Sequence, residues 1–342
     1  MVGKCKVLHV SNSRRFRNGL TTHVQRSHPL TGTWTITEGN AGNQRQAQAL
    51  AAALGRPARD IVLQPRAPWR WAAPRRLPLA TGGFGEEFAL ALASPPGLAI
   101  GCGRQAALAT RLLRAQGSRA VQILDPRIAP RHWDLVIAPE HDDLRGGNVI
   151  RLLGSLHPVD DEWLDAARRR FAALAALPGP RTALLLGGAS AHARFPQEWM
   201  KALAGRLQRA VAAEDGCLLV TTSRRTPADV CALLREHFGG TAGVLWSGPG
   251  DGANPYPGML ACADRIVCTA DSVNMLSEAC ATRAPVFVAG LEHVSGRPRR
   301  FIDSLVGLGR VRGFDDTLAP FAVTPLRETA RVAGLVREQL GL

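Results

Sequence analysis

The sequence predicts an α/β protein made of two doubly wound, Rossmann-like domains that face each other across a cleft. Short apolar runs rich in β-branched residues alternate with helical patterns along the chain. Glycine-containing loops follow several of these runs, as they do in nucleotide-binding sheets. The 342 residues, 46% of them hydrophobic, are enough for two domains of about 150 residues each.

Charge and cysteine content narrow the classes of function. The formal net charge of +14 favours phosphorylated ligands, an anionic membrane surface or nucleic acid. Because the sequence has no zinc finger, RNP-type aromatic pattern or helix-turn-helix, we expect no nucleic-acid partner. The seven cysteines lack a CxxC spacing, which favours reduced thiols in a cytoplasmic protein and neither a metal nor a cofactor. No apolar run reaches the roughly 18–20 residues of a membrane-spanning helix, so membrane contact would be peripheral, at the inner membrane.

Residues 1–32 form a basic segment without Asp or Glu. A targeting segment or a basic tail is one interpretation. We favour a disordered leader or a mis-assigned start codon, since the segment is weakly periodic. No apolar core of a secretory signal is present.

The first domain is expected over residues 33–177. Thr33–Thr37 is predicted to be a strand, Glu38–Gln44 a loop and Arg45–Leu54 a helix. Glycine and asparagine tolerate positive φ and let a ligand approach the backbone closely. We therefore expect a ligand to approach this loop closely, with a plain tight turn as the alternative. The candidate residues are Gly39, Asn40, Gly42, Asn43 and Gln44.

Two further segments of the first domain are candidate ligand sites. Gly103 and Arg104 follow the expected strand Gly97–Ile100 and open a helix, which is typical of an anion site. The Pro-rich segment Gln64–Leu79 carries Trp69, Trp71 and basic residues that suit a membrane surface or a lipid-linked or phosphorylated acceptor. Tryptophans folded onto the body of the protein are the favoured alternative.

Four ionisable residues follow the expected strand Leu135–Ala138. In open α/β sheets the chemistry lies at the carboxyl ends of the strands. His141 and Asp142 are therefore candidate catalytic bases. A solvated acidic turn is the alternative.

Pro178-Gly179-Pro180 is the best linker in the sequence, and the second domain is expected over residues 181–325, with a closing helix at 326–342. Thr182–Leu186 is predicted to be a strand that ends in a glycine loop. A second expected strand ends in a Ser/Thr/Arg turn, where hydroxyls and arginines suit a diphosphate. The candidate diphosphate ligands in this turn are Ser223, Arg224, Arg225 and Thr226.

The remainder of the sequence is organised around Cys262–Gly290, which is predicted to form strand, loop, helix and strand. Asp271 and Ser272 lie in the loop, where Ser272 is expected to cap the helix and offer free N–H groups to a phosphate. Glu278 lies nearly two turns further on the same helix face, placed to bind vicinal hydroxyls. An ordinary capped helix with an exposed glutamate is the alternative.

Several motifs together resemble the mitochondrial-fission "elongated mitochondria" family, whose bacterial members are mostly uncharacterised. SRRTP at 223–227 and DSVNMLSEA at 271–279 are the most specific, and EGNAGNQ, ILDPR, APEHDDLRGG and LLLGGAS agree with them. The resemblance begins at about Thr33 and extends to the C-terminus. The expected architecture also resembles GT-B glycosyltransferases.

The GT-B resemblance implies a nucleotide-diphosphate sugar on the second domain. It would place Ser223–Thr226, Ser272 and the glycine loop with Gly187, Gly188 and Ser190 at the diphosphate, and Glu278 at the ribose. The first-domain loops at 39–44 and 101–104 would face the acceptor, and no metal would be bound. The first-domain loop lacks the usual glycine run and histidine of those enzymes. The leading prediction is a metal-independent glycosyltransferase; the alternatives are a non-catalytic adaptor of the fission type and a nucleotide-sugar epimerase.

Overall fold

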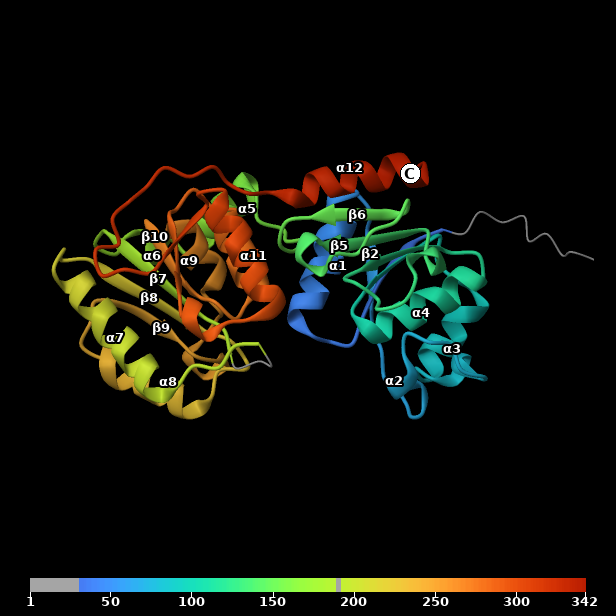
Figure 1. The fold of residues 1–342 in the computed structure, drawn as a ribbon, viewed down its shortest axis with the longest axis horizontal. Coiled ribbons are helices and arrows are strands. Elements are labelled where there is room, and N and C mark those ends of the chain that lie inside the picture. Colours follow the sequence, from blue (N-terminus) through green and yellow to red (C-terminus); the bar gives the residue numbers. More distant parts are fainter. Residues whose placement is uncertain (1–30, 189–191) are drawn as a thin grey trace, which may run out of the picture.

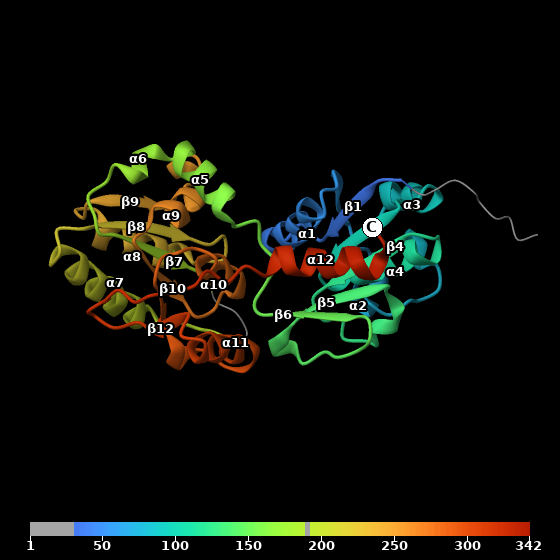
Figure 2. The ribbon, with the colours of Figure 1, turned by 90° about the horizontal axis from the view of Figure 1, so that it is seen from above.

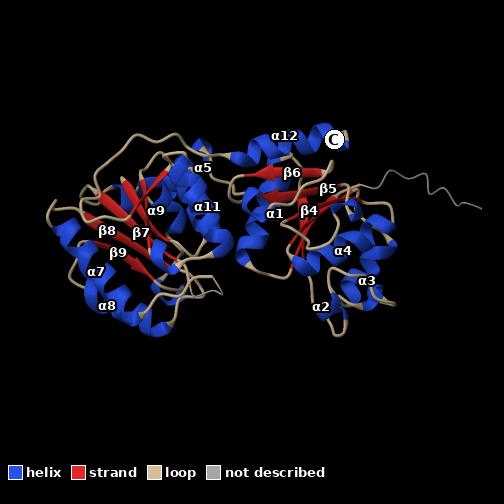
Figure 3. Cartoon of the chain, in the orientation of Figure 1, coloured by secondary structure: helices blue, strands red, loops and turns tan. Residues whose placement is uncertain are grey.

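The computed structural model describes residues 31–188 and 192–342. Each half contains one fully parallel six-stranded sheet with helices on both faces (Figures 1 and 3). This confirms the predicted fold class. The basic segment at 1–32 lies almost wholly outside the described residues.

The first sheet has the strand order β2-β1-β3-β4-β5-β6. Its strands are short apolar runs covered on both sides, as parallel sheets require. One face packs against α1 and α12 and the other against α3 and α4. The elements of this half are β1 Thr33–Thr37, α1 Ala41–Ala53, β2 Ala58–Val62, α2 Trp69–Ala72, η1 Ala80–Gly82, α3 Glu86–Ala93, β3 Leu98–Cys102, α4 Arg104–Ala115, β4 Arg119–Ile123, η2 Pro130–His132, β5 Leu135–Pro139, η3 Glu140–Asp142 and β6 Val149–Leu152.

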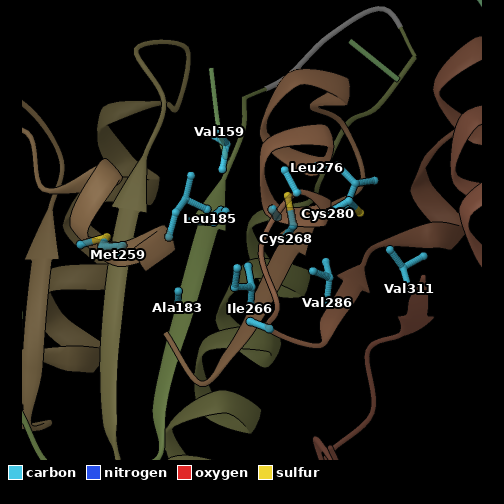
Figure 4. Packing of buried hydrophobic residues seen from close by; sticks show 14 of the residues in the cluster. Val159, Ala183, Leu185, Met259, Ile266, Cys268, Leu276, Cys280, Val286 and Val311 are labelled. Carbon is cyan, nitrogen blue, oxygen red and sulfur yellow. The ribbon is translucent and has the colours of Figure 1, made fainter. Parts of the chain in front are cut away.

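The second sheet has the strand order β12-β11-β10-β7-β8-β9. Helices α7 and α8 cover one face. Helices α5, α9, α10 and α11 cover the other, where Met259, Leu276 and Cys280 are buried with residues of the strands (Figure 4). The elements are α5 Asp161–Arg170, α6 Ala172–Ala175, β7 Arg181–Leu186, α7 Gln197–Ala212, β8 Cys217–Thr222, α8 Ala228–Phe238, β9 Gly243–Trp246, η4 Pro249–Asp251, α9 Tyr256–Cys262, β10 Arg265–Thr269, α10 Val273–Cys280, β11 Val286–Ala289, η5 Leu291–His293, α11 Gly296–Gly307, β12 Val311–Gly313 and α12 Glu328–Leu340.

Two segments pack on a different half of the molecule from the one that the expected boundary at Pro178–Pro180 assigns to them. Helices α5 and α6 precede this boundary in sequence, yet Leu164 and Leu174 belong to the hydrophobic core of the second sheet. By packing, the chain therefore reaches the second half before α5. In the other direction, α12 returns to the first half, where Val332 and Val336 are buried against Leu50 of α1 (Figure 2). Both crossings follow from burial of the apolar face of an amphipathic helix.

The six cysteines of the described residues are free, and five of them are buried. This agrees with the expected reduced core thiols. Among the described residues, no helix combines the length and the apolar composition needed to span a bilayer.

Candidate functional site

Each sheet reverses its strand order at one point. In the first sheet this switch point lies between β1 and β3, and in the second it lies between β7 and β10. Ligands of open α/β sheets bind in the crevice outside the carboxyl ends of the strands at such points. Most of the predicted nucleotide-binding residues follow β7, β8 or β10, so the structure gathers them at the second switch point.

A buried carboxylate joins the loops after β7 and β10. The backbone N–H of Gly188 donates to Asp271 Oδ2 at 2.7 Å, and Thr269 Oγ1 donates to Asp271 Oδ1 at 2.7 Å. The N–H of Gly187 in turn donates to Thr269 Oγ1 at 2.9 Å. Burial raises the pKa of Asp271 above its usual range. Asp271 therefore holds the glycine loop in place through these hydrogen bonds. Ser190, predicted in the same loop, lies outside the described residues.

Glycine is required here because the loops approach so closely. A Cβ at Gly187 would lie 1.8 Å from Asp271 Oδ2, and one at Gly188 would lie 2.5 Å from the backbone of Arg225. Neither neighbour is the free end of a flexible side chain, so the approach depends on the missing side chains. The glycine loop thereby touches the loops after both β8 and β10.

The Ser/Thr/Arg turn after β8 is held by its own hydroxyls. Thr226 Oγ1 accepts from the N–H of Ser223 at 3.0 Å and donates to the carbonyl of Gly187 at 2.6 Å. Arg224 and Arg225 are exposed. Within the described residues neither forms an ion pair. The turn therefore presents two unpaired guanidinium groups beside the glycine loop.

Ser272 caps α10, as predicted: its Oγ accepts from the N–H of Met275 at 3.4 Å. Glu278, predicted to bind ribose hydroxyls, is not the exposed glutamate of the alternative, because its side chain is only 3% exposed. Both its oxygens accept from Arg45 Nη1 of α1, at 2.8 and 2.9 Å, and Oε2 also accepts from the hydroxyl of Tyr256. Glu278 thus joins the two halves of the molecule.

The electrostatics of this group follow from its burial. Burial, followed by the charge of Glu278, raises the pKa of Tyr256 well above its usual range, so the phenol stays a donor. Burial alone lowers the pKa of Arg45, but the attraction and hydrogen bond of Glu278 turn the shift into a net rise. Beside it, Gln46 Nε2 donates to Asn274 Oδ1 at 3.3 Å. The N-terminal turns of α1 and α10 therefore contact each other between the two sheets.

The first switch point is filled by groups of its own half. Glu38 Oε1 accepts from the N–H of Gln105 at 2.9 Å and caps α4. Gly103 has φ +100°, and a Cβ there would lie 2.7 Å from Asn43 Nδ2. A carboxylate thus already occupies the helix N-terminus that was expected to receive an anion.

The Gly/Asn loop is shorter than predicted. Asn40 has extended backbone angles and is the N-cap residue, so α1 begins at Ala41 rather than Arg45. Gly42, Asn43 and Gln44 consequently lie in the first turn of the helix, and Gly39 keeps the expected positive φ of 84°. The side chain of Asn40 forms no capping hydrogen bond.

Arg104 points away from the switch point. Its Nη1 donates to the carbonyls of Trp71 and Ala73 at 3.3 and 3.2 Å, and its Nη2 donates to the carbonyl of Arg70 at 3.1 Å. The guanidinium therefore binds the C-terminal carbonyls of α2. Of the tryptophans there, Trp69 donates to the carbonyl of Pro78, whereas Trp71 is 73% exposed.

The candidate bases lie against α11 of the other half. Asp142 forms an ion pair with Arg297 at 3.2 Å, and the carbonyl of His141 accepts from Arg300 Nη2 at 2.7 Å. Burial and then Arg300 lower the pKa of His141 to about 4, so the imidazole is neutral at pH 7. Burial raises the pKa of Asp142. A neutral imidazole accepts a proton, but one with a pKa of about 4 is a weak base.

Several functional candidates were not predicted: Arg45, Tyr256, Asn274, Arg297 and Arg300. Each contacts a predicted residue or a predicted element from a distant part of the sequence. The only Tyr of the chain, within NPYPG, was a visible signal. Within the described residues, no three His, Cys, Asp or Glu side chains are grouped to hold a metal ion.

Two parallel, doubly wound halves joined by a returning C-terminal helix define the GT-B class of fold. Within that class, the chain belongs to the mitochondrial fission ELM1 family, whose model matches residues 41–340. The mitochondrial fission protein ELM1 of Arabidopsis thaliana is 32% identical over 276 residues, which are 72% of this chain and 64% of that protein. This chain thus spans less than two thirds of that relative. An uncharacterised protein of Rickettsia prowazekii, RP120, is 24% identical over 89% of this chain and 97% of its own length.

Solved structures support the fold. The UDP-GlcNAc 2-epimerase of Methanocaldococcus jannaschii aligns with 91% of this chain and all of its own, at 12% identity and a TM-score of 0.57. A second structure of that epimerase, in complex with UDP-GlcNAc and UDP, aligns over the same share with a TM-score of 0.52. At this identity the likeness concerns the fold alone.

Proposed function

We propose that this protein binds a nucleotide-diphosphate sugar at the second switch point and transfers its glycosyl group to an acceptor hydroxyl. One observation carries the proposal: the exposed, unpaired Arg224 and Arg225 lie beside a glycine loop and a capped helix N-terminus where the strand order reverses. Guanidinium groups bind phosphate oxygens bidentately, and N–H groups of the loop and helix add donors. The solved epimerase complex with UDP-GlcNAc and UDP is consistent with this class of ligand.

In the proposed reaction, the acceptor oxygen attacks the anomeric carbon while the bond from that carbon to the diphosphate breaks. The acceptor proton passes to the carboxylate of Asp142 or to His141. The leaving diphosphate gains negative charge, which Arg224, Arg225 and the N–H groups stabilise as a preorganised electrostatic site. Asp142 would act as the base only after Arg297 releases its carboxylate.

The buried state of Glu278 supports a second candidate function. A carboxylate that is 3% exposed and bound by Arg45 and Tyr256 offers no free oxygen to a ribose. Unless the two halves separate, the donor site lacks this ligand. A protein that keeps the fold but acts as an adaptor, as the fission family name implies, would have this arrangement.

Thermal stability with added nucleotide sugars tests the proposal. The full chain would be screened against UDP-, GDP-, ADP-, CMP- and dTDP-sugars beside Arg224→Ala/Arg225→Ala and a matched pair, Arg169→Ala/Arg209→Ala. The control arginines are also exposed and unpaired within the described residues. A ligand at 100 times its Kd adds roughly 2.7 kcal/mol of stability. We expect one nucleotide family to stabilise the parent and the control but not the Arg224/Arg225 variant.

The outcomes separate the candidate functions. Release of nucleoside diphosphate together with a glycosylated acceptor supports transfer, whereas an altered sugar still attached to its nucleotide supports an epimerase. If no nucleotide sugar stabilises even the parent, the donor site is absent and the adaptor function is favoured.

A further inference from the structure

A cationic pocket of about 570 Å³ lies at the start of strand β4, at the end of the first sheet opposite to its switch point. It is formed at the C-terminal end of α4, at the start of β4 and beside η2. These are amino ends of parallel strands, the edge opposite to the one that holds the switch point. The pocket is therefore separate from the proposed donor site.

The lining carries far more positive than negative charge. Its charged residues are Arg76, Arg111, Arg114 and Arg119, together with His132 and a single acid, Asp134. Asp134 is fully engaged, because Oδ1 accepts from Arg114 Nε at 3.0 Å and Oδ2 accepts from the N–H of Ala120 at 2.7 Å. Within the described residues Arg76 and Arg119 form no ion pair. The pocket thus keeps uncompensated guanidinium groups.

Two of the arginines are already held in place. Arg111 Nη1 donates to the carbonyl of Pro74 at 2.6 Å, and its guanidinium lies 5.9 Å from the ring centroid of Trp133. Arg114 Nη1 donates to the carbonyl of Arg131 at 3.1 Å. Side chains fixed before binding lose less conformational entropy when a ligand arrives. Such a pocket is preorganised for an anion.

The pKa shifts of two lining residues agree with this excess of positive charge. Burial and then Arg76 lower the pKa of Arg111, and burial followed by Arg111, Arg131 and Arg114 lowers the pKa of His132. The groups facing His132 from α4 and η2 are thus cations. Like charges that repel in the free protein are relieved when an anion binds between them.

The helix dipole does not account for this cluster. Basic residues are favourable near a helix C-terminus, which explains Arg114 in the last turn of α4. Arg76 comes from the segment after α2, and Arg119 begins β4. Separate parts of the chain thus bring like charges together.

We propose that this pocket binds a phosphate-bearing anion, either a soluble phosphorylated compound or the headgroup of an anionic phospholipid. Arginine matches phosphate oxygens in a planar, bidentate geometry. The volume of about 570 Å³ lies within the range of about 300–1,000 Å³ typical of small-molecule sites.

The test uses the full chain carrying Arg224→Ser and Arg225→Ser, so that the proposed donor site does not bind the probe. Calorimetric titration with sodium pyrophosphate would compare this parent with added Arg76→Ser/Arg119→Ser or, as a charge-matched control, Arg169→Ser/Arg209→Ser. All four arginines are exposed, so the variants are expected to fold. The pocket variant should lose at least about tenfold in affinity, or ~1.4 kcal/mol, and the control should keep the affinity of the parent.

A flotation assay then distinguishes the two sources of phosphate. Vesicles of phosphatidylcholine alone are compared with vesicles that also contain phosphatidic acid. Flotation with phosphatidic acid that is lost only in the pocket variant identifies a lipid headgroup, whereas pocket-dependent pyrophosphate binding without flotation identifies a soluble compound. Equal pyrophosphate affinities in the pocket and control variants, or no pyrophosphate binding by the parent, would overturn the proposal.

Discussion

The two switch points look alike in sequence but differ in how their charged side chains are used. At the first, Glu38 caps α4 and Arg104 binds the carbonyls that end α2. At the second, Asp271 is buried beneath the glycine loop, and Arg224 and Arg225 remain exposed. Similar local sequences therefore leave an arginine bound within its own half at the first switch point and exposed at the second.

The largest expected effect concerns the close approach at the second switch point. Gly187→Ala would place a Cβ 1.8 Å from Asp271 Oδ2 and should lower the free energy of unfolding by about 3 kcal/mol in urea denaturation. Gly205→Ala on α7 is the control: its Cβ meets nothing within 4 Å, and alanine should raise helix stability by roughly 0.5–1 kcal/mol. Similar stability of the two variants would contradict the rigid loop described above.

The second-largest loss of stability is expected for the ion pair of Arg45 and Glu278, which joins the two halves. Arg45→Met leaves the buried Glu278 with Tyr256 alone and should cost about 2 kcal/mol, between the values for buried and surface pairs. Arg59→Met breaks an exposed pair with Glu87, whose side chains are 61% and 65% exposed, and should cost about 1 kcal/mol or less. Urea denaturation of both variants checks the order, which equal losses would refute.

The stability of the junction between the two halves should also depend on pH. His157 exchanges backbone hydrogen bonds with Thr329 Oγ1 of α12, at 3.0 and 2.8 Å, and burial lowers its pKa to about 4. The pKa of His157 in the folded protein lies below its unfolded value of about 6.5. The stability that its neutral imidazole contributes is therefore complete above pH 6.5 and is lost as the pH drops toward 4. At pH 5 the loss should be between about 1 and 2 kcal/mol.

His157→Gln is the matching measurement for this titration. Free energies of unfolding for the parent and the variant, taken between pH 7.5 and 4.5, should show a shallower decline in the variant. Parallel curves would assign the acid sensitivity to other groups, among them His141, whose pKa is also about 4.

The smallest expected effect on stability is the difference between removing the N-cap side chain of α10 and removing that of α1. Ser272→Ala removes the side-chain cap of α10 and should cost about 1 kcal/mol. Asn40→Ala removes no capping hydrogen bond from α1 and should have a smaller effect. Thermal midpoints would compare the two, and a larger shift for Asn40→Ala would mean that its side chain binds the helix in solution.

Local signals predicted the strands well because buried parallel strands are short continuous apolar runs. Thr33–Thr37 coincides with β1, and Leu135–Ala138 and Thr182–Leu186 each differ from β5 and β7 by one residue. The three-residue strand β12 was missed, and so was the true start of α1, since Asn40 gives no stronger helix signal than the glycines around it. The spatial grouping of the β7, β8 and β10 loops was predictable because strand ends share one edge of a sheet.

The sequence by itself determined the class of fold, the capped start of α10 and which residues gather at the carboxyl edge of the second sheet. These depend on local periodicity and on loop chemistry within a few residues. Only the tertiary structure decided that Glu278 is bound by Arg45, 233 residues earlier in the chain, and that Arg104 binds α2. A side chain's partner depends on how whole helices pack, and this packing brings distant residues together in ways that no local pattern records.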